Sequence, residues 1–368
     1  MRNRFVAIAV VLAGLQAGCS ADPSLKEIYK DSFLVGAAVS QAVFTGRDAV
    51  SAAIVRKHFN TITAENVLKW QHVQPKPGVY PFEAQDRFVE FGEKNGMFIV
   101  GHTLVWHNQT PEWVFQDEHG GPASRELLLE RLRDHIHTVV GRYKGRIHAW
   151  DVVNEALNSD GALRETPWLK IIGEEYLAKA FQFAHEADPA AELYYNDYSL
   201  EYEAKRDGAV ALIRRLQAQG VPVAGIGSQG HNKLARPTVE QHEAMIAAFR
   251  PLGIKIMITE LDVDVLPPAT RGQGAEVTDR AELAAELNPY ADGLPEEDQQ
   301  ALAERYAELF RVYHKHRDVI ARVTFWGVTD ATSWLNNWPV RGRTSYPLLF
   351  NREGRPKPAF HAVAEAGR

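Results

Sequence analysis

The sequence contains almost no cysteine. Cys19 is the single cysteine among 368 residues, so an intramolecular disulfide is impossible. A zinc or iron–sulfur site built on several cysteine ligands is excluded for the same reason. The 14 histidines include no H-E-x-x-H pattern, the spacing that places two metal-binding imidazoles on one helix face. We therefore expect no metal and no cofactor, and a fold stabilised by packing alone.

The sequence also lacks an excess of positive charge and a long hydrophobic run. Lys and Arg total 41 against 47 for Asp and Glu, which gives a net charge of −6, so a nucleic-acid partner is not expected. The longest apolar stretch, residues 5–15, is too short for a bilayer, which needs about 20 residues. With 45% hydrophobic residues the chain has ample core material, and we expect a globular monomer without a transmembrane segment.

The N-terminus has the layout of an export signal. A basic start, Met1 to Arg4, precedes the apolar run and a stretch of small residues that ends at Ala21. This pattern predicts a secretory signal peptide over residues 1–21 and a single domain over 25–368. The segment Ala17-Gly18-Cys19 also resembles a bacterial lipoprotein signal, in which the cysteine becomes a lipid anchor. Both readings predict export, to the extracellular medium, the periplasm or the outer membrane.

Short β-prone runs alternate with longer amphipathic ones through the rest of the chain. We expect strands at 33–39, 59–64, 97–104, 147–154, 192–196, 225–229, 254–261 and 323–327. Helices are expected near 47–58, 83–95, 124–143, 169–187, 202–219, 238–250, 297–316 and 358–366, with residues 263–296 as a long irregular loop. Eight such units predict an α/β fold of the (β/α)8 TIM-barrel type in a single domain. An open doubly wound sheet is the alternative.

Two glutamates end otherwise apolar strands of this predicted barrel. Glu155 follows the fourth strand and Glu260 the seventh, and functional groups of such barrels gather at the carboxyl ends of the strands. A pair of carboxyl groups is what retaining cleavage of a glycosidic bond requires: one protonated group to donate to the leaving oxygen, and one ionised group to attack the anomeric carbon. On neighbouring strands, Gln229 and His231 share a face, as do Glu260 and Asp262, so His231 is expected between two carboxylates.

Tryptophans gather at the same predicted edge. Six of the eight follow strand ends, and a flat indole face fits the C–H face of a sugar ring. They are Trp70, Trp106, Trp113, Trp326, Trp334 and Trp338. Trp150 and Trp168 are expected in the core. The pattern predicts a cleft that binds a carbohydrate.

These residues lie in ordered motifs that resemble glycoside hydrolase family 10, the endo-1,4-beta-xylanases. The resemblance runs from residue 33 to about 364 and includes Thr63-Ala64-Glu65-Asn66, Gly101-His102-Thr103-Leu104-Val105-Trp106-His107, Trp150-Asp151-Val152-Val153-Asn154-Glu155-Ala156, Tyr195-Asn196-Asp197-Tyr198, Gly227-Ser228-Gln229-Gly230-His231, Ile258-Thr259-Glu260-Leu261-Asp262 and Phe325-Trp326-Gly327-Val328-Thr329-Asp330. One departure is Ser199, at a position where members of the family frequently have Asn.

The resemblance implies a role for each matching residue. Glu155 would be the acid/base and Glu260 the nucleophile, with His231 and Asp262 supporting the nucleophile. The sugar at the scissile bond would be contacted by His102, Trp106, Asn154, Gln229, Trp326 and Trp334. The next sugar toward the non-reducing end would be contacted by Glu65, Asn66 and Lys69, and the aglycone side by Tyr198. The implied activity is retaining hydrolysis of xylan or xylo-oligosaccharides. A β-1,4-glucanase on the same barrel and a catalytically silent carbohydrate-binding protein remain as alternatives.

Overall fold

The computed structural model describes residues 24–268, 276 and 278–368. The expected signal peptide over residues 1–21 and the anchor candidate Cys19 lie outside the described residues. Within the described ranges no helix is long and apolar enough to cross a membrane.

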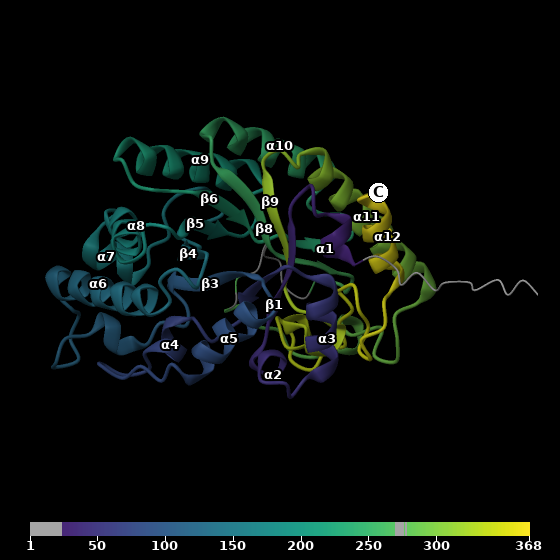
Figure 1. Ribbon diagram of the computed structural model, residues 1–368, viewed down its shortest axis with the longest axis horizontal. Coiled ribbons are helices and arrows are strands. Elements are labelled where there is room, and N and C mark those ends of the chain that lie inside the picture. The colour runs from purple at the N-terminus through teal and green to yellow at the C-terminus, as the bar shows by residue number, and fades with distance from the viewer. Residues whose placement is uncertain (1–23, 269–275, 277) are drawn as a thin grey trace, which may run out of the picture.

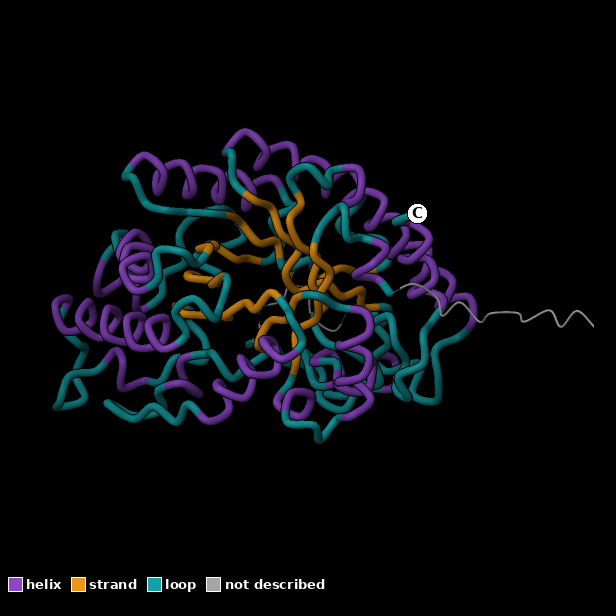
Figure 2. Tube along the Cα trace, in the orientation of Figure 1, coloured by secondary structure: helices purple, strands orange, loops and turns teal. Residues whose placement is uncertain are grey.

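Eight parallel strands form a closed barrel that helices surround (Figures 1 and 2). The strands of the barrel are β1 (Leu34–Val39), β2 (Thr61–Ala64), β3 (Phe98–Val105), β4 (Ala149–Asn154), β5 (Glu192–Asp197), β6 (Gly225–Ser228), β8 (Lys255–Asp264) and β9 (Ile320–Phe325). Each pairs in parallel with its neighbours in the order β6-β5-β4-β3-β2-β1-β9-β8, and a parallel pairing between β6 and β8 closes the ring. The predicted (β/α)8 barrel is therefore confirmed, and the open sheet was the wrong alternative.

The helices of the described chain follow the strands on the outside of the ring. They are α1 (Leu25–Ile28), α2 (Gln41–Phe44), α3 (Ala49–His58), α4 (Trp70–Val73), α5 (Glu83–Lys94), α6 (Arg125–Arg142), α7 (Pro167–Ile172), α8 (Tyr176–Ala187), α9 (Glu203–Ala218), α10 (Val239–Phe249), α11 (Glu296–Lys315) and α12 (Pro358–Ala366). Short 3-10 turns lie at η1 (Glu112–Phe115), η2 (Arg250–Leu252), η3 (Ala285–Leu287), η4 (Asp330–Thr332) and η5 (Trp334–Asn336).

Local sequence signals explain where several helices begin. The side chains of Ser124, Thr166 and Thr238 cap α6, α7 and α10 by accepting backbone N–H groups of the first turn. Proline occupies the first position of α7 and α12, where its missing N–H would have no partner in the helix. These caps satisfy backbone donors that burial would otherwise leave unpaired.

Among the predicted elements whose bounds differ from the structure, two depart near a glycine. The helix expected over 169–187 is two helices, α7 and α8, because Gly173 has φ 88 and ends the first of them. The last strand lies at Ile320–Phe325 rather than 323–327, and the chain turns away at Gly327, which has φ 124. Both angles are readily adopted only by glycine.

A short ninth strand extends the barrel wall on one side. β7 (His231–Lys233) pairs in parallel with the end of β8, with His231 opposite Asp262. This pairing prolongs β8 to Asp264, beyond the predicted end at 261. Glu260 therefore lies inside a strand rather than at its end, and its backbone N–H donates to the carbonyl oxygen of Gln229 at 2.7 Å.

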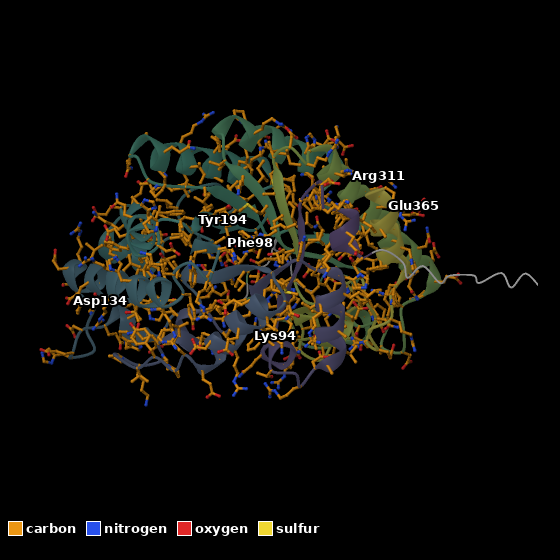
Figure 3. The ribbon with its side chains drawn as sticks, in the orientation of Figure 1. Lys94, Phe98, Asp134, Tyr194, Arg311 and Glu365 are labelled. Carbon is orange, nitrogen blue, oxygen red and sulfur yellow. The ribbon has the colours of Figure 1, made fainter. Side chains whose placement is uncertain are left out.

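Apolar side chains fill both the inside of the barrel and the layer between strands and helices. Val100, Ala149, Tyr194 and Met257 pack together as one small cluster, with Phe98 against them. Figure 3 shows Tyr194 and Phe98 among the strands, whereas the exposed Asp134, Arg311 and Glu365 lie at the periphery. A larger cluster contains the fully buried Trp150 and Trp168, as predicted. The inside of the barrel is thus a packed core, and functional groups are expected at the carboxyl ends of its strands.

Gly101 shows how tightly β3 and β4 are packed. A Cβ atom at this position would lie 2.1 Å from the indole ring of Trp150, which is completely buried. We expect Gly101→Ala to lower the free energy of unfolding by roughly 1–3 kcal/mol, the usual cost of overpacking a core. Urea denaturation of the purified protein measures this change.

The matched control is Gly141→Ala in the exposed part of α6, where an added Cβ meets nothing within 4 Å. This variant should be neutral or slightly more stable, since alanine favours the helix over glycine. Equal destabilisation by both substitutions would contradict the packing argument.

Candidate active site

A cavity of about 160 Å³ opens at the carboxyl ends of the strands and collects most of the predicted site residues. It is lined by Glu65, Asn66, Lys69, His102, Trp106, Gln109, Asn154, Glu155, Gln229, His231, Glu260, Trp326 and Trp334. Twelve of these were predicted from the sequence. The thirteenth, Gln109, was not predicted as a site residue. Two predicted site residues, Asp262 and Tyr198, do not line this cavity.

Glu155 leaves β4 in an unusual backbone conformation. Its φ is 57°, in the left-handed region that few residues with a long side chain adopt, and its backbone N–H donates to the carbonyl oxygen of Asn196 over 2.9 Å. The carboxyl group accepts hydrogen bonds from Trp106 Nε1 at 2.9 Å, Gln229 Nε2 at 2.8 Å and Asn154 Nδ2 at 3.2 Å. The side chain is only 3% exposed, so these donors fix its orientation.

The surroundings of Glu155 favour its protonated form. Burial, and next the negative charge of Asp197, raise the pKa of Glu155 to about 7, against the hydrogen bonds of Gln229 and Trp106. None of its three hydrogen-bond donors carries a charge. Glu155 therefore keeps its proton in mildly acidic solution, where an ordinary glutamate has lost it.

Glu260 has a different environment. Its carboxyl group accepts a hydrogen bond from Asn196 Nδ2 at 2.8 Å, and His231 Nε2 lies 3.4 Å from its other oxygen. Burial by itself would raise the pKa of Glu260, but the His231 hydrogen bond and the positive charges of His231 and Lys69 outweigh it and lower the pKa. Glu260 is thus ionised under conditions in which Glu155 holds a proton.

Asn196 joins the two glutamates and was not predicted as a site residue. Its side-chain amide nitrogen donates both to Glu260 and, over 2.9 Å, to Asn154 Oδ1, while Asn154 donates to Glu155. Thr259 Oγ1 donates to the oxygen of the same amide at 2.6 Å and so fixes its orientation. The signal in the sequence was its place at the end of the fifth strand, in the run Tyr195-Asn196-Asp197-Tyr198.

His231 lies between Glu260 and Asp262. Its Nδ1 is 3.0 Å from Asp262 Oδ1, and the other oxygen of Asp262 accepts the indole N–H of Trp334 at 2.7 Å. Burial would lower the pKa of His231, but the charges and hydrogen bonds of Asp262 and Glu260 raise it to about 10. The imidazole is therefore positively charged over the whole neutral range, and Asp262 acts on Glu260 through it.

The opposite wall of the cavity carries the predicted contacts for the neighbouring sugar. Lys69 Nζ donates to Asn66 Oδ1 at 3.1 Å and lies 5.1 Å from the centre of the Trp106 ring. Burial lowers the pKa of Lys69 and raises the pKa of Glu65. His102 lies edge-on to Trp326 and is hydrogen-bonded to the buried Asp151 at 2.9 Å. This wall offers charged, amide and aromatic groups to a polyhydroxylated ligand.

A second cavity of about 430 Å³ continues the first on the far side of His231. The two cavities share His231 and Trp334, and Asp262 and Trp338 also line the second one. Trp334 and Trp338 stack with ring centres 4.4 Å apart. The combined space is an elongated cleft with the two glutamates in its smaller part.

Three predicted aromatic positions lie elsewhere. Trp70 is buried and stacks on His135 of α6 with ring centres 3.5 Å apart, so it packs against a helix rather than lining the cleft. Trp113 lies under the Arg131 guanidinium and lines separate surface hollows. Tyr198 is buried, with its hydroxyl accepting a hydrogen bond from Arg164 at 2.7 Å. Its contact with the aglycone stays a prediction.

The departure at Ser199 has a backbone explanation. Ser199 has φ 58, in the left-handed region where Asn is several-fold enriched over most residues. The frequent Asn of the family thus suits this angle better than Ser does.

Within the described ranges, no group of three or more His, Cys, Asp or Glu side chains is placed to hold a metal ion.

The fold and the site together define a glycosidase. Two carboxyl groups in opposite protonation states share one cavity of a (β/α)8 barrel, and aromatic rings line the cleft on both sides of them. The chain belongs to glycosyl hydrolase family 10, whose model matches residues 24–366.

Similar proteins agree with this membership over nearly the whole chain. The endo-1,4-beta-xylanase A of Xylanibacter ruminicola is 41% identical over 356 residues, which cover 97% of this chain and 96% of that protein. The beta-1,4-xylanase of Dictyoglomus thermophilum is 44% identical over 93% of this chain and 91% of its own. A GH10 endoxylanase structure from a sugarcane soil metagenome is 47% identical, with a TM-score of 0.90 over 93% of this chain and 99% of that one.

Proposed function

We propose that this glycosidase is a retaining endo-1,4-beta-xylanase that hydrolyses internal xylosidic bonds of xylan. One observation carries the proposal: Glu155 and Glu260 meet at one cavity with raised and lowered pKa values respectively. A raised pKa suits a group that donates a proton, and a lowered pKa suits a group that attacks as an anion. The xylanase relatives support xylan as the substrate class.

The reaction follows from these two states. Glu155 gives its proton to the oxygen of the leaving sugar while the carboxylate of Glu260 attacks the anomeric carbon, so the glycosidic bond breaks as a glycosyl ester forms. Glu155, now ionised, then takes a proton from water, and the resulting hydroxide displaces Glu260 from the anomeric carbon. The product keeps the β configuration and Glu155 regains its proton.

The residues around the pair have separate proposed roles. The charged His231, with Asp262 behind it, and Asn196 hold Glu260 ionised and oriented. The sugar at the scissile bond is contacted by His102, Trp106, Asn154, Gln229, Trp326 and Trp334. Glu65, Asn66 and Lys69 contact the next sugar toward the non-reducing end.

Removing each carboxyl group should have a distinct result. Glu260→Ala should abolish hydrolysis of both xylan and aryl xylobiosides, because no group attacks the anomeric carbon. Glu155→Ala should lose xylan hydrolysis but keep more activity on dinitrophenyl xylobioside, whose leaving group needs no proton. Initial rates on both substrates measure this difference.

Two results would contradict the assignment. One is a Glu260→Ala turnover within about tenfold of the parent, a change of only ~1.4 kcal/mol in the barrier. The other is an equal loss on both substrates in Glu155→Ala.

Xylan and carboxymethylcellulose distinguish the proposed activity from its alternatives. The enzyme should release reducing sugar from xylan far faster than from carboxymethylcellulose, and proton NMR should show the β-anomer of the new reducing end first. Preferred release from carboxymethylcellulose would make the protein a glucanase. Release from neither would favour a binding protein, and an α-anomer appearing first would refute the retaining mechanism.

We also propose that the enzyme works as an exported monomer. The support for export is the signal-like layout of residues 1–21, which lie outside the described residues. When the full chain is expressed in a bacterium with a lipoprotein pathway, the intact mass of the mature protein should correspond either to cleavage after Ala21 or to a lipidated Cys19. An unprocessed mass that starts at Met1 would contradict export.

A further inference from the structure

A buried ion pair lies behind the turn that carries Glu155. Asp197 ends β5 and Lys205 is in the first turn of α9; both side chains are completely buried, with Lys205 Nζ 2.7 Å from Asp197 Oδ1. Such a pair costs roughly several kcal/mol per ion in desolvation and is often no more stabilising than apolar residues of the same volume. Its position beside the cleft therefore calls for a reason other than stability.

Hydrogen bonds through Tyr195 connect this pair to the backbone that follows Glu155, and a main-chain bond to β5 holds the backbone N–H of Glu155 itself. The Tyr195 hydroxyl donates to Asp197 Oδ2 at 2.5 Å and accepts the backbone N–H of Ala156, the residue after Glu155, at 3.2 Å. The N–H of Glu155 itself donates to the carbonyl of Asn196, also on β5. The unfavourable φ of Glu155 is thus held at two successive peptide groups, and strained conformations persist only where the surroundings hold them this way.

Contacts with Tyr198 fix the positions of the two charged groups of the pair. Asp197 Oδ1 also accepts the backbone N–H of Tyr198 at 2.9 Å, and Lys205 Nζ lies 3.5 Å from the centre of the Tyr198 ring. With neither partner exposed, water cannot screen the charge of Asp197 from Glu155. The negative charge of Asp197 is one of the causes that raise the pKa of Glu155.

We propose that the Asp197–Lys205 pair is a positioning device for Glu155, which holds its backbone turn through Tyr195 and sets by its charge balance how readily Glu155 releases its proton. The inference rests on the proposed acid/base role of Glu155. Other titratable or charged groups that act on Glu155 or on the pair come from several elements: Glu260 on β8, Lys69 before α4, His107 after β3, Tyr176 on α8, and Tyr198 and Glu201 in loops. Arg164 faces them through its hydrogen bond to the Tyr198 hydroxyl.

Changing one charge at a time should move the basic limb of the pH profile in opposite directions. In Asp197→Asn the anion is gone and Glu155 releases its proton more readily, so the basic limb of kcat/KM should move to lower pH by roughly half a unit or more. In Lys205→Met the charge of Asp197 is no longer balanced, so the limb should move to higher pH. The double variant removes both charges and should lie between them. A purely structural role would shift none of these limbs.

Tyr195→Phe tests the positioning without changing any charge. It removes both hydrogen bonds of the hydroxyl, so kcat should fall at least about tenfold while KM and the basic limb stay close to those of the parent. Because this variant keeps the ion pair intact, it remains informative where a charge variant fails to fold. A parental kcat in Tyr195→Phe would overturn the positioning role.

A second buried Lys–Asp pair provides the control. Lys357 Nζ lies 2.9 Å from Asp330 Oδ2 beyond β9, across the barrel from β4. Lys357→Met should lower stability without moving the basic limb. A shift equal to that of Lys205→Met would show a general effect of destabilisation and overturn the inference.

Carbon-13 NMR of labelled glutamate separates this inference from the proposed function. The Glu155 carboxyl is assigned by its loss in Glu155→Gln, and its pKa is then followed in the Asp197 and Lys205 variants without reference to activity. A pKa that moves in both directions while the activity limb stays fixed would support the pair and contradict the acid/base role. A pKa unmoved in either charge variant would overturn the inference itself.

Discussion

The pairing of β6 with β8 is the constraint on which the site depends. It closes the ring, and only in a closed ring do the carboxyl ends of β4 and β8 face a common space. The amide of Asn196 then reaches Asn154 on one side and Glu260 on the other. Glu155 and Glu260, more than 100 positions apart along the chain, are in this way linked through the side chains of Asn154 and Asn196. These two asparagines lie on strands, which are more precise supports than loops.

Both glutamates are buried, so burial does not distinguish them. Their pKa values differ because the groups that contact them differ in charge. Glu155 receives hydrogen bonds from an indole and two amides, all neutral, and a buried anion lies behind it. Glu260 receives one from the amide of Asn196, and an imidazole that Asp262 keeps charged lies 3.4 Å from its other oxygen. Burial acts in the same direction on both carboxyl groups, so the choice between a neutral donor and a cationic one decides which group holds the proton.

Much of this arrangement was readable from the sequence because buried strands appear as short apolar runs that are easy to locate. The alternation of apolar runs predicted all eight barrel strands, and polar residues that follow such runs in a parallel barrel must meet at one end. The last strand was predicted at 323–327 and lies at Ile320–Phe325, since the apolar pattern does not show that the chain leaves the sheet before Gly327. The helix over 169–187 was likewise too long, because Gly173 breaks it without interrupting the amphipathic pattern.

What the sequence could not give was the direction of individual side chains. Trp70 follows Lys69 directly, yet Lys69 points into the cavity and Trp70 packs onto α6. Asn196 contacts both halves of the site through one amide, a geometry that position in a strand does not reveal. The role of Asp197 depends on Lys205 in another element, and such pairings appear only once the helix is packed on the sheet.

The first and last parts of the described chain meet on the side of the barrel remote from the cleft. β1 lies between β2 and β9, and the Tyr29 hydroxyl of the segment after α1 donates to the carbonyl of Val363 in α12 at 2.6 Å. Because α1 precedes the amino end of β1, residue 24 and the carboxyl end of α12 both lie toward the floor of the barrel. A surface, bead or fused module joined there would hold the enzyme with its groove turned outward, free to approach an insoluble polymer.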